Sequence, residues 1–329
     1  MSIETLFFAV KAGSLAGYIA ALGIVIAGEC LNIKSNIIHQ CSHNHLLPSR
    51  LLSRLLAEAL GVLVLAPPVD VYGRSHLGYH HKVGLIASLD DEDVHFIQWL
   101  GFYPGMSTDE AWRNFRRVLT SPGVHCRLLG RRMKENFLQG HPLRRAATWL
   151  WWMTVAGTTA ATGRADLVTM GYLLPITVLY QIGMMTYVVS EHMHFCHPAG
   201  DKSRDWHGLM SHARFVGVPL PPAGLPIVSR IKAYARFGIG MLGALAVRVI
   251  VIPGELATHS AHHWRASADW TCAPYAYRDL KATMPQRARE SWGLRNALQA
   301  VFEGMSRAAR NQGYPESPTS SHCRPTKPD

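Results

Sequence analysis

The heptapeptide THSAHHW, residues 258–264, places histidines at positions i, i+3 and i+4 of one short segment. These positions share one face of an α-helix, so the imidazoles of His259, His262 and His263 can converge on one point. Neutral imidazole is a ligand for iron, zinc, copper and nickel. The heptapeptide therefore predicts part of a metal site.

Two further segments carry histidines at helical spacing: HQCSH at residues 39–43 and HLGYHH at residues 76–81. A single histidine in an apolar protein is usually a satisfied core residue, but three such groups beside apolar segments are hard to explain by packing. One zinc ion needs three or four ligands, so the eight histidines favour two metal ions. These candidate ligands are His39, His43, His76, His80, His81, His259, His262 and His263.

Long apolar runs dominate the rest of the chain, of which 48% is hydrophobic and 17% charged. A bilayer core needs about 20 helical residues. We therefore expect an all-α integral membrane protein with one domain over residues 1–311. Its transmembrane helices are predicted at about 12–38, 146–163 and 167–190. The remaining residues, 312–329, are rich in Pro, Ser and Thr and are predicted to form a disordered tail.

Two other apolar stretches are predicted to lie along the membrane surface. Residues 50–66 are too short for a hairpin through the bilayer, and residues 231–252 carry Lys232, Arg236 and Arg248, which are costly in lipid. Because neither stretch crosses, all the histidine groups fall on one side. The arginine-rich segment 113–145 makes that side cytoplasmic by the positive-inside rule, which in a bacterium would be the cytoplasmic face of the inner membrane.

The three histidine segments, in this order and with this spacing from the apolar runs, resemble the histidine boxes of the membrane fatty acid desaturase and alkane hydroxylase superfamily. The resemblance covers roughly residues 30–285. It extends to the segment 273–280, APYAYRDL, after the third box, and to the acidic run 90–93 after the second. Many members have two spans before the first box, whereas one fits here, so the resemblance leaves the N-terminal topology open.

The resemblance implies a site with two iron ions and O2 as co-substrate. It also implies a ninth ligand after the last transmembrane hairpin, where the hydroxylase branch has a segment ending in Glu-His. Here His192 occupies that place, with His194 and His197 as competitors and His45 as an extension of the first box. The second box has the longer H-x3-HH spacing, which occurs with both activities and does not separate them.

The activity implied is O2-dependent desaturation of a fatty acyl chain carried on a lipid or another acyl carrier. A hydroxylase or other oxygenase of the same superfamily is the alternative, and a histidine-rich metal transporter or an inactive membrane scaffold is a third. Because the chain has no nucleotide fingerprint, haem motif or cysteine cluster, the resemblance implies an external electron donor such as a ferredoxin. The net charge of +11 suits anionic headgroups or an acidic carrier, and a nucleic acid partner would leave the apolar runs unused.

Overall fold

A computed structural model describes residues 15–82, 84–197, 208–266, 269–285 and 288–312. The described chain is mostly helical, in agreement with the predicted all-α class, and its strands form one two-stranded sheet. Three helices are long and apolar enough to cross a membrane, namely Gly17–Ser42, Ala165–Glu191 and Ile227–Ile250. The predicted tail lies outside the described residues apart from Gln312, where the last helix ends.

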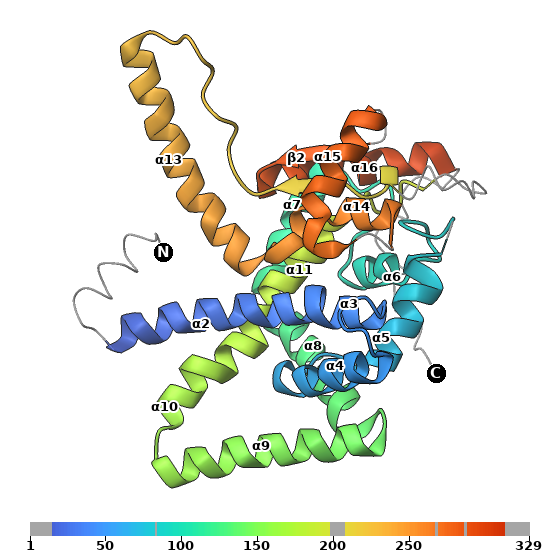
Figure 1. Ribbon diagram of the computed structural model, residues 1–329, viewed down its shortest axis with the longest axis vertical. Coiled ribbons are helices and arrows are strands. Elements are labelled where there is room, and N and C mark those ends of the chain that lie inside the picture. The colour runs from blue at the N-terminus through green and yellow to red at the C-terminus, as the bar shows by residue number, and fades with distance from the viewer. Residues whose placement is uncertain (1–14, 83, 198–207, 267–268, 286–287, 313–329) are drawn as a thin grey trace.

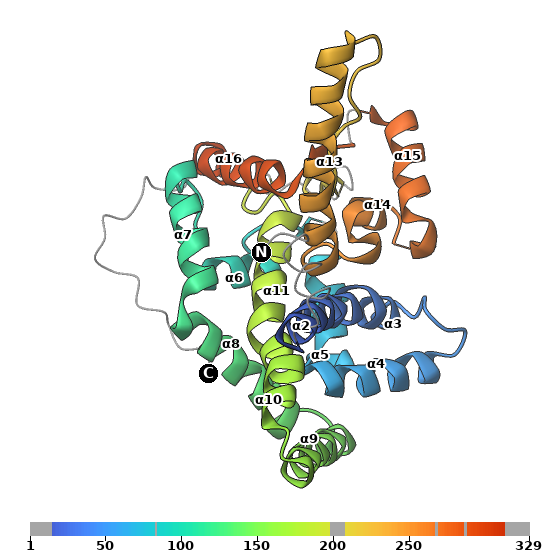
Figure 2. The same ribbon diagram turned by 90° about the vertical axis from the view of Figure 1, so that its left-hand side faces the viewer.

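The apolar helices extend to one side of the molecule and meet near its centre (Figure 1). Viewed from that side, α2 points toward the reader, with α13 above it and α10 below (Figure 2). The bounds of these helices are α2 Leu15–Asn32, α3 His39–Ser42, α9 Pro142–Thr162, α10 Ala165–Val168, α11 Tyr180–Glu191 and α13 Ile227–Ile250. A π-helical turn over Ile33–Ile38 joins α2 to α3, and turns over Thr169–Leu173 and Pro175–Leu179 lie between α10 and α11.

Glycines allow the C-terminal end of α13 to pack closely on the other apolar helices. A Cβ atom added at Gly28 of α2 would lie 2.0 Å from the carbonyl oxygen of Val249, and one at Gly183 of α11 would lie 2.5 Å from that of Ile250. Small residues at such crossings are typical of helix packing in membranes. The contacts hold the chain that follows α13, which leads into the histidine segment 258–264.

Two buried arginines secure the end of α4, Arg50–Val64, where the chain bends sharply into α5, Val69–Ser75. Arg132 donates hydrogen bonds to the carbonyl oxygens of Val64 and Leu65, and Arg144 donates to that of Ala66. The end of a helix exposes carbonyl groups without intrahelical partners, and cations there are favourable. The arginines therefore fix the direction in which α5 carries the second histidine segment.

The more polar helices surround the inner ends of the apolar ones. They are α6 Glu92–Trp99, α7 Thr108–Thr120, α8 Pro122–Met133, α14 His259–Trp264, α15 Ala273–Thr283 and α16 Leu294–Gln312. Strand β1, Ala213–Phe215, pairs in parallel with β2, Glu290–Trp292. The buried Arg214 on β1 donates to the carbonyl oxygens of Tyr187 and Leu256, which ties the end of α11 to the turn before α14.

The helices follow the predicted stretches, but two of them differ in hydropathy from the expectation. The helix at 142–162, in the place of a predicted span, is not among the three apolar enough to cross, whereas α13, predicted to lie at the surface, is among them. Arg144 and a run of small polar residues lower the hydropathy of α9. In α13, the apolar residues outweigh its four basic ones.

Candidate metal centre

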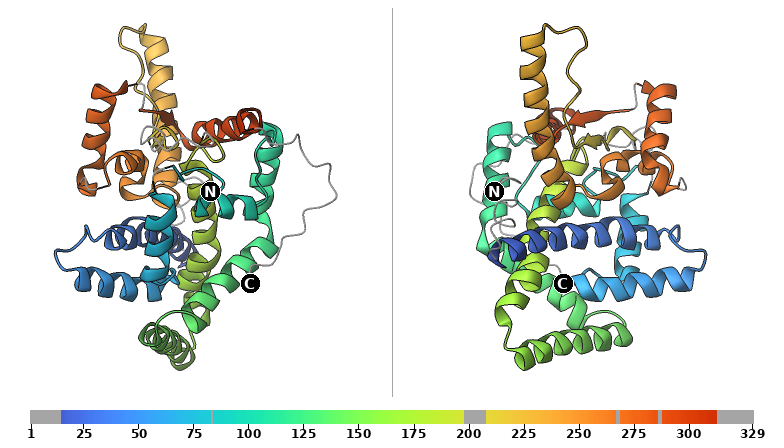
Figure 3. Two further views of the ribbon diagram at one scale, coloured as in Figure 1. Left: turned by 90° about the vertical axis from the view of Figure 1, so that its right-hand side faces the viewer. Right: turned by 60° about the vertical axis from the view of Figure 1, so that its left-hand side comes forward.

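Four elements bring the predicted histidines together where the apolar helices meet the polar ones. His39 and His43 come from α3 and its end, and a π-helical turn, His76–His80, follows α5. His192 directly follows α11, and the third segment forms α14. Both views in Figure 3 place the short orange α14 next to the blue end of α2 and α3. All nine sequence-derived candidates lie in this one cluster.

The histidines form two groups, each of which could hold a metal ion. Within each group the potential ligand atoms all lie within 4.8 Å of one another. The first group contains His39, His43, His76, His81 and His262. The second contains His80, His192 and His263. His259 lies between the groups, with its ring centroid 5.0 Å from that of His39 and 4.7 Å from that of His263.

A π-helical turn divides the second histidine segment between the two groups. The backbone N–H of His81 donates to the carbonyl oxygen of His76, an i to i+5 hydrogen bond that replaces the α-helical i to i+4 pattern. This wider turn brings His76 and His81 into the first group and leaves His80 to the second. An unbroken α-helix would instead have paired His76 with His80.

The ring nitrogens of the first group lie at separations expected of ligands on one ion. The Nε2 atom of His39 lies 3.1 Å from the Nε2 atoms of His76 and His262, and that of His262 lies 3.2 Å from that of His43. Two ligands about 2.1 Å from one metal lie between about 3.0 Å apart when adjacent and about 4.2 Å apart when opposite. The group therefore has the dimensions of a coordination sphere.

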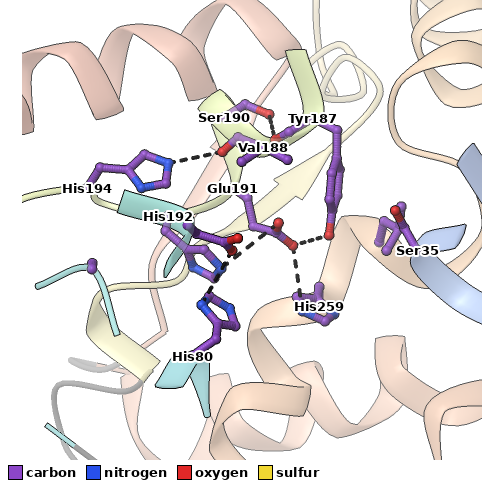
Figure 4. Close-up of polar contacts among 12 residues, drawn as sticks. Ser35, His80, Tyr187, Val188, Ser190, Glu191, His192, His194 and His259 are labelled. Carbon is purple, nitrogen blue, oxygen red and sulfur yellow. Dashed lines mark hydrogen bonds and ion pairs between the residues drawn. The ribbon is translucent and has the colours of Figure 1, made fainter. Parts of the chain in front are cut away.

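The buried carboxylate of Glu191, the last residue of α11, lies beside the second group (Figure 4). Its Oε1 atom lies 3.6 Å from Nε2 of His259, and its Oε2 atom lies 4.0 Å from Nε2 of His192. Tyr187, one turn earlier on α11, donates its hydroxyl hydrogen to Oε1. A carboxyl oxygen donor that the histidine pattern did not reveal therefore lies beside the second group.

Asp91 fixes the orientation of His80 from outside the group. Its carboxylate accepts a hydrogen bond from Nδ1 of His80 at 3.1 Å and from the backbone N–H of Ala87 at 2.7 Å. The Nε2 atom of His80 is thereby left for the metal position, as in carboxylate–histidine–metal arrangements. Burial would raise the pKa of Asp91, but the His80 ring and the backbone amides hold it below its ordinary value.

Several ring nitrogens in the cluster lack the hydrogen bonds that buried polar groups require. His192 is fully buried, and neither of its ring nitrogens has a hydrogen-bond partner; Nε2 of His81 also has none. Burial and then neighbouring imidazoles lower the pKa of His81, His262 and His263 well below the ordinary value. Buried, neutral imidazoles are suitable metal ligands, and a bound ion would also satisfy the ring nitrogens of His192 and His81 that have no hydrogen-bond partner.

The competing histidines occupy other positions. His45 is exposed and stacks on His43 with a centroid separation of 5.7 Å. The Nε2 atom of His194 lies 3.0 Å from the carbonyl oxygen of Val188, which turns this ring away from the second group (Figure 4). His197 is buried but belongs to neither group. Among these candidates, His192 is therefore the one that the structure brings to the cluster.

A cleft of about 420 Å³ adjoins the metal centre. Its apolar wall includes Phe96, Trp99 and Met184, and its charged residues include Lys34 and Glu92. A smaller hollow, lined by histidines of both groups, shares part of this lining. The residues common to both are Lys34, Tyr72, Asp93 and Val188. The cleft thus connects the histidine cluster with a mixed apolar and charged surface.

The geometry alone describes a histidine-rich centre that could hold metal ions, next to helices that could cross a membrane. Sequence comparisons identify no relative: no protein-family model and no curated protein sequence matches the chain.

Proposed function

We propose that this protein is an O2-dependent di-iron membrane enzyme that desaturates a fatty acyl chain on a lipid or another acyl carrier. The observation that carries the proposal is a cluster of nine histidines from four separate elements at the inner ends of apolar helices, in which eight form two adjacent groups and His259 lies between them. The resemblance of the three histidine segments to the desaturase and alkane hydroxylase superfamily supports the same activity.

The donor set is compatible with redox-active iron, and the proposed reaction requires a redox-active centre. Imidazole suits iron, and attack on an unactivated C–H bond requires a metal or an organic cofactor. When bound, two iron ions would supply O2 activation with electrons from an external donor. The residues of the chain hold those ions, and the adjoining cleft with Phe96, Trp99 and Met184 would position the substrate chain beside them.

The cluster's position also supports an enzyme over a transporter. A transporter places its ion-binding residues near mid-membrane depth in broken helices. Here the histidines lie at the ends of the apolar helices: His39 and His43 at the end of the first, and His192 directly after the second. We place this end at the cytoplasmic face, because the arginine-rich helices α7 and α8 lie there as well.

The test is an iron and product analysis of the protein purified anaerobically in detergent. We expect about two iron ions per chain, together with O2 uptake when an electron donor and acyl lipids or acyl carriers are added. Mass spectrometry should show products two hydrogens lighter than the substrate. A gain of one oxygen would assign the protein to the hydroxylases instead.

The variant His262→Ala removes a candidate ligand, and His141→Ala, which changes an exposed histidine outside both groups, is the matched control. We expect the first to lose iron and O2 uptake and the second to retain both. Wild-type protein that binds no iron would contradict the proposal, as would turnover that survives in His262→Ala.

A further inference from the structure

Two buried carboxylates approach the second group of histidines, and they face opposite sides of the imidazole rings. Asp91 contacts His80 at Nδ1, which leaves the Nε2 atom of this ring for a metal ion. Glu191 faces His192 and His259 at Nε2. Because Nε2 is also the atom through which the rings of the first group converge, Glu191 lies on the metal side of the rings and Asp91 lies outside.

The contacts of Glu191 differ from those of a carboxylate that orients a histidine. Its oxygens lie 3.6 Å from Nε2 of His259 and 4.0 Å from Nε2 of His192, beyond ordinary hydrogen-bond length. Both separations fall within the range of about 3.0 to 4.2 Å that two ligands of one metal ion span. Glu191, Asp93 and His192 also form a group whose ligand atoms lie within 4.8 Å of one another.

The surroundings of Glu191 hold its carboxylate at this position. The residue is 4% exposed, and Tyr187 donates a hydrogen bond to Oε1. The guanidinium of Arg214 lies 3.6 Å from the same oxygen while it donates to backbone carbonyls on either side. A buried carboxylate requires pairing or metal coordination, and the neighbouring His192 has two ring nitrogens without hydrogen-bond partners.

We infer that Glu191 is a metal ligand, which makes the two ions of the proposed centre chemically different. The inference rests on the proposed two-metal function. The first ion has imidazole ligands alone, from the group that contains His39 and His262. The second has an anionic oxygen donor in addition to imidazoles of the group that contains His192. Because a carboxylate is a harder donor than imidazole, the second ion binds differently and favours its ferric form.

The experiment measures metal binding by the purified protein, without any turnover. The full-length protein is freed of metal, titrated with Co(II) as a spectroscopic probe, and then reconstituted with ⁵⁷Fe(II) for Mössbauer spectroscopy. We expect two ions per chain in the wild type, with two distinct iron signals of equal area. In Glu191→Gln, the weaker dissociation constant should rise by about 10-fold or more, and one of the two signals should change.

Two controls separate the role of Glu191 from a general loss of charge or of structure. Asp90→Asn removes an exposed carboxylate next to Asp91 and should leave both ions unchanged. Tyr187→Phe keeps the carboxylate but removes its hydrogen bond from Tyr187, and it should weaken the second site less than Glu191→Gln does. If Glu191→Gln does not fold, two identical iron signals in the wild type would still overturn the inference.

The outcomes distinguish this inference from the proposed function. A wild-type protein that binds no metal would overturn both. A second outcome is that the wild type binds two ions and Glu191→Gln binds them with the same stoichiometry, affinity and spectra. That result would overturn the role of Glu191 and leave the two-metal centre in place.

Discussion

At the scale of single residues, the sequence predicts which histidines gather but not how they divide. The spacing of His76, His80 and His81 indicates one shared helical face, whereas the π-helical turn sends His80 to a different group from its neighbours. Such a turn depends on one backbone hydrogen bond, which residue spacing does not encode. The roles of Glu191 and Asp91 were missed for a related reason, because neither belongs to the histidine spacing: Asp91 is one of four acidic residues in the run 90–93, and Glu191 directly precedes His192.

The Asp91→Asn substitution tests the orientation of His80. If the amide presents its NH2 group to Nδ1 of His80, that nitrogen becomes the acceptor and the proton moves to Nε2, the nitrogen that is left for the metal. We expect the affinity of the weaker metal site to fall by about 10- to 100-fold, as is typical when such a partner is lost. Co(II) titration of the metal-free protein measures this change.

The matched control for Asp91→Asn is Asp93→Asn, since Asp93 is also within 3.4 Å of Nδ1 of His80 but is partly exposed. We expect a smaller loss of affinity in this variant. Equal losses in both variants would show that the total negative charge, and not the hydrogen bond from His80 to Asp91, sets the affinity.

At the scale of elements, the apolar runs predict where helices form, and the structure has helices along each of them. Hydropathy does not encode how helices contact one another. The packing of α13 on α2 depends on Gly28, because the carbonyl oxygen of Val249 occupies the space that a side chain would need. This contact is visible only in the three-dimensional structure. The sequence shows this glycine as one of 28 in the chain, with no feature that marks it.

The Gly28→Ala substitution tests this crossing. The added methyl group would meet a backbone oxygen at 2.0 Å, which cannot move aside as a flexible side chain can. Overpacking of this kind typically destabilises a protein by about 1–3 kcal/mol. We expect a lower melting temperature in detergent, together with weaker metal retention, because α13 leads directly into the chain that carries His259.

Gly157→Ala is the control for this substitution, since a Cβ atom there has nothing within 4 Å and the residue lies within α9. Alanine is the better helix former by about 1 kcal/mol, so the melting temperature should stay equal or rise. A Gly28→Ala protein as stable as the wild type would mean that α2 and α13 are not packed closely in the membrane.

At the scale of the whole molecule, exposed arginines line a cleft among the polar helices. A cleft of about 670 Å³ lies between α7 and α16. Arg113, Arg116 and Arg295 line it and are exposed, and Trp112 forms part of its wall. Such a surface is complementary to an acidic protein, whose encounter it would accelerate through electrostatic attraction.

Packed side chains lie between this cleft and the metal centre. The ring of Trp112 lies 5.0 Å from that of Phe302 on α16, with the planes nearly perpendicular. Gly304, two residues further along α16, lies against Met193, which directly follows His192. An electron donor bound at the cleft would therefore be separated from the second histidine group by packed side chains of α16 and of the segment after α11.

We therefore expect the double substitution Arg113→Glu and Arg116→Glu to weaken the association of an acidic [2Fe–2S] ferredoxin by about 10-fold or more at low salt. Surface plasmon resonance on the protein in nanodiscs measures this association, and added salt should weaken wild-type binding as well, because exposed charges are screened. Arg164→Glu reverses a charge on the turn between α9 and α10, at the outer end of the apolar helices, and should leave binding unchanged. If the double variant binds as tightly as the wild type, the donor does not dock at the cleft between α7 and α16. If Arg164→Glu weakens binding to the same extent, net charge and not this surface determines the association.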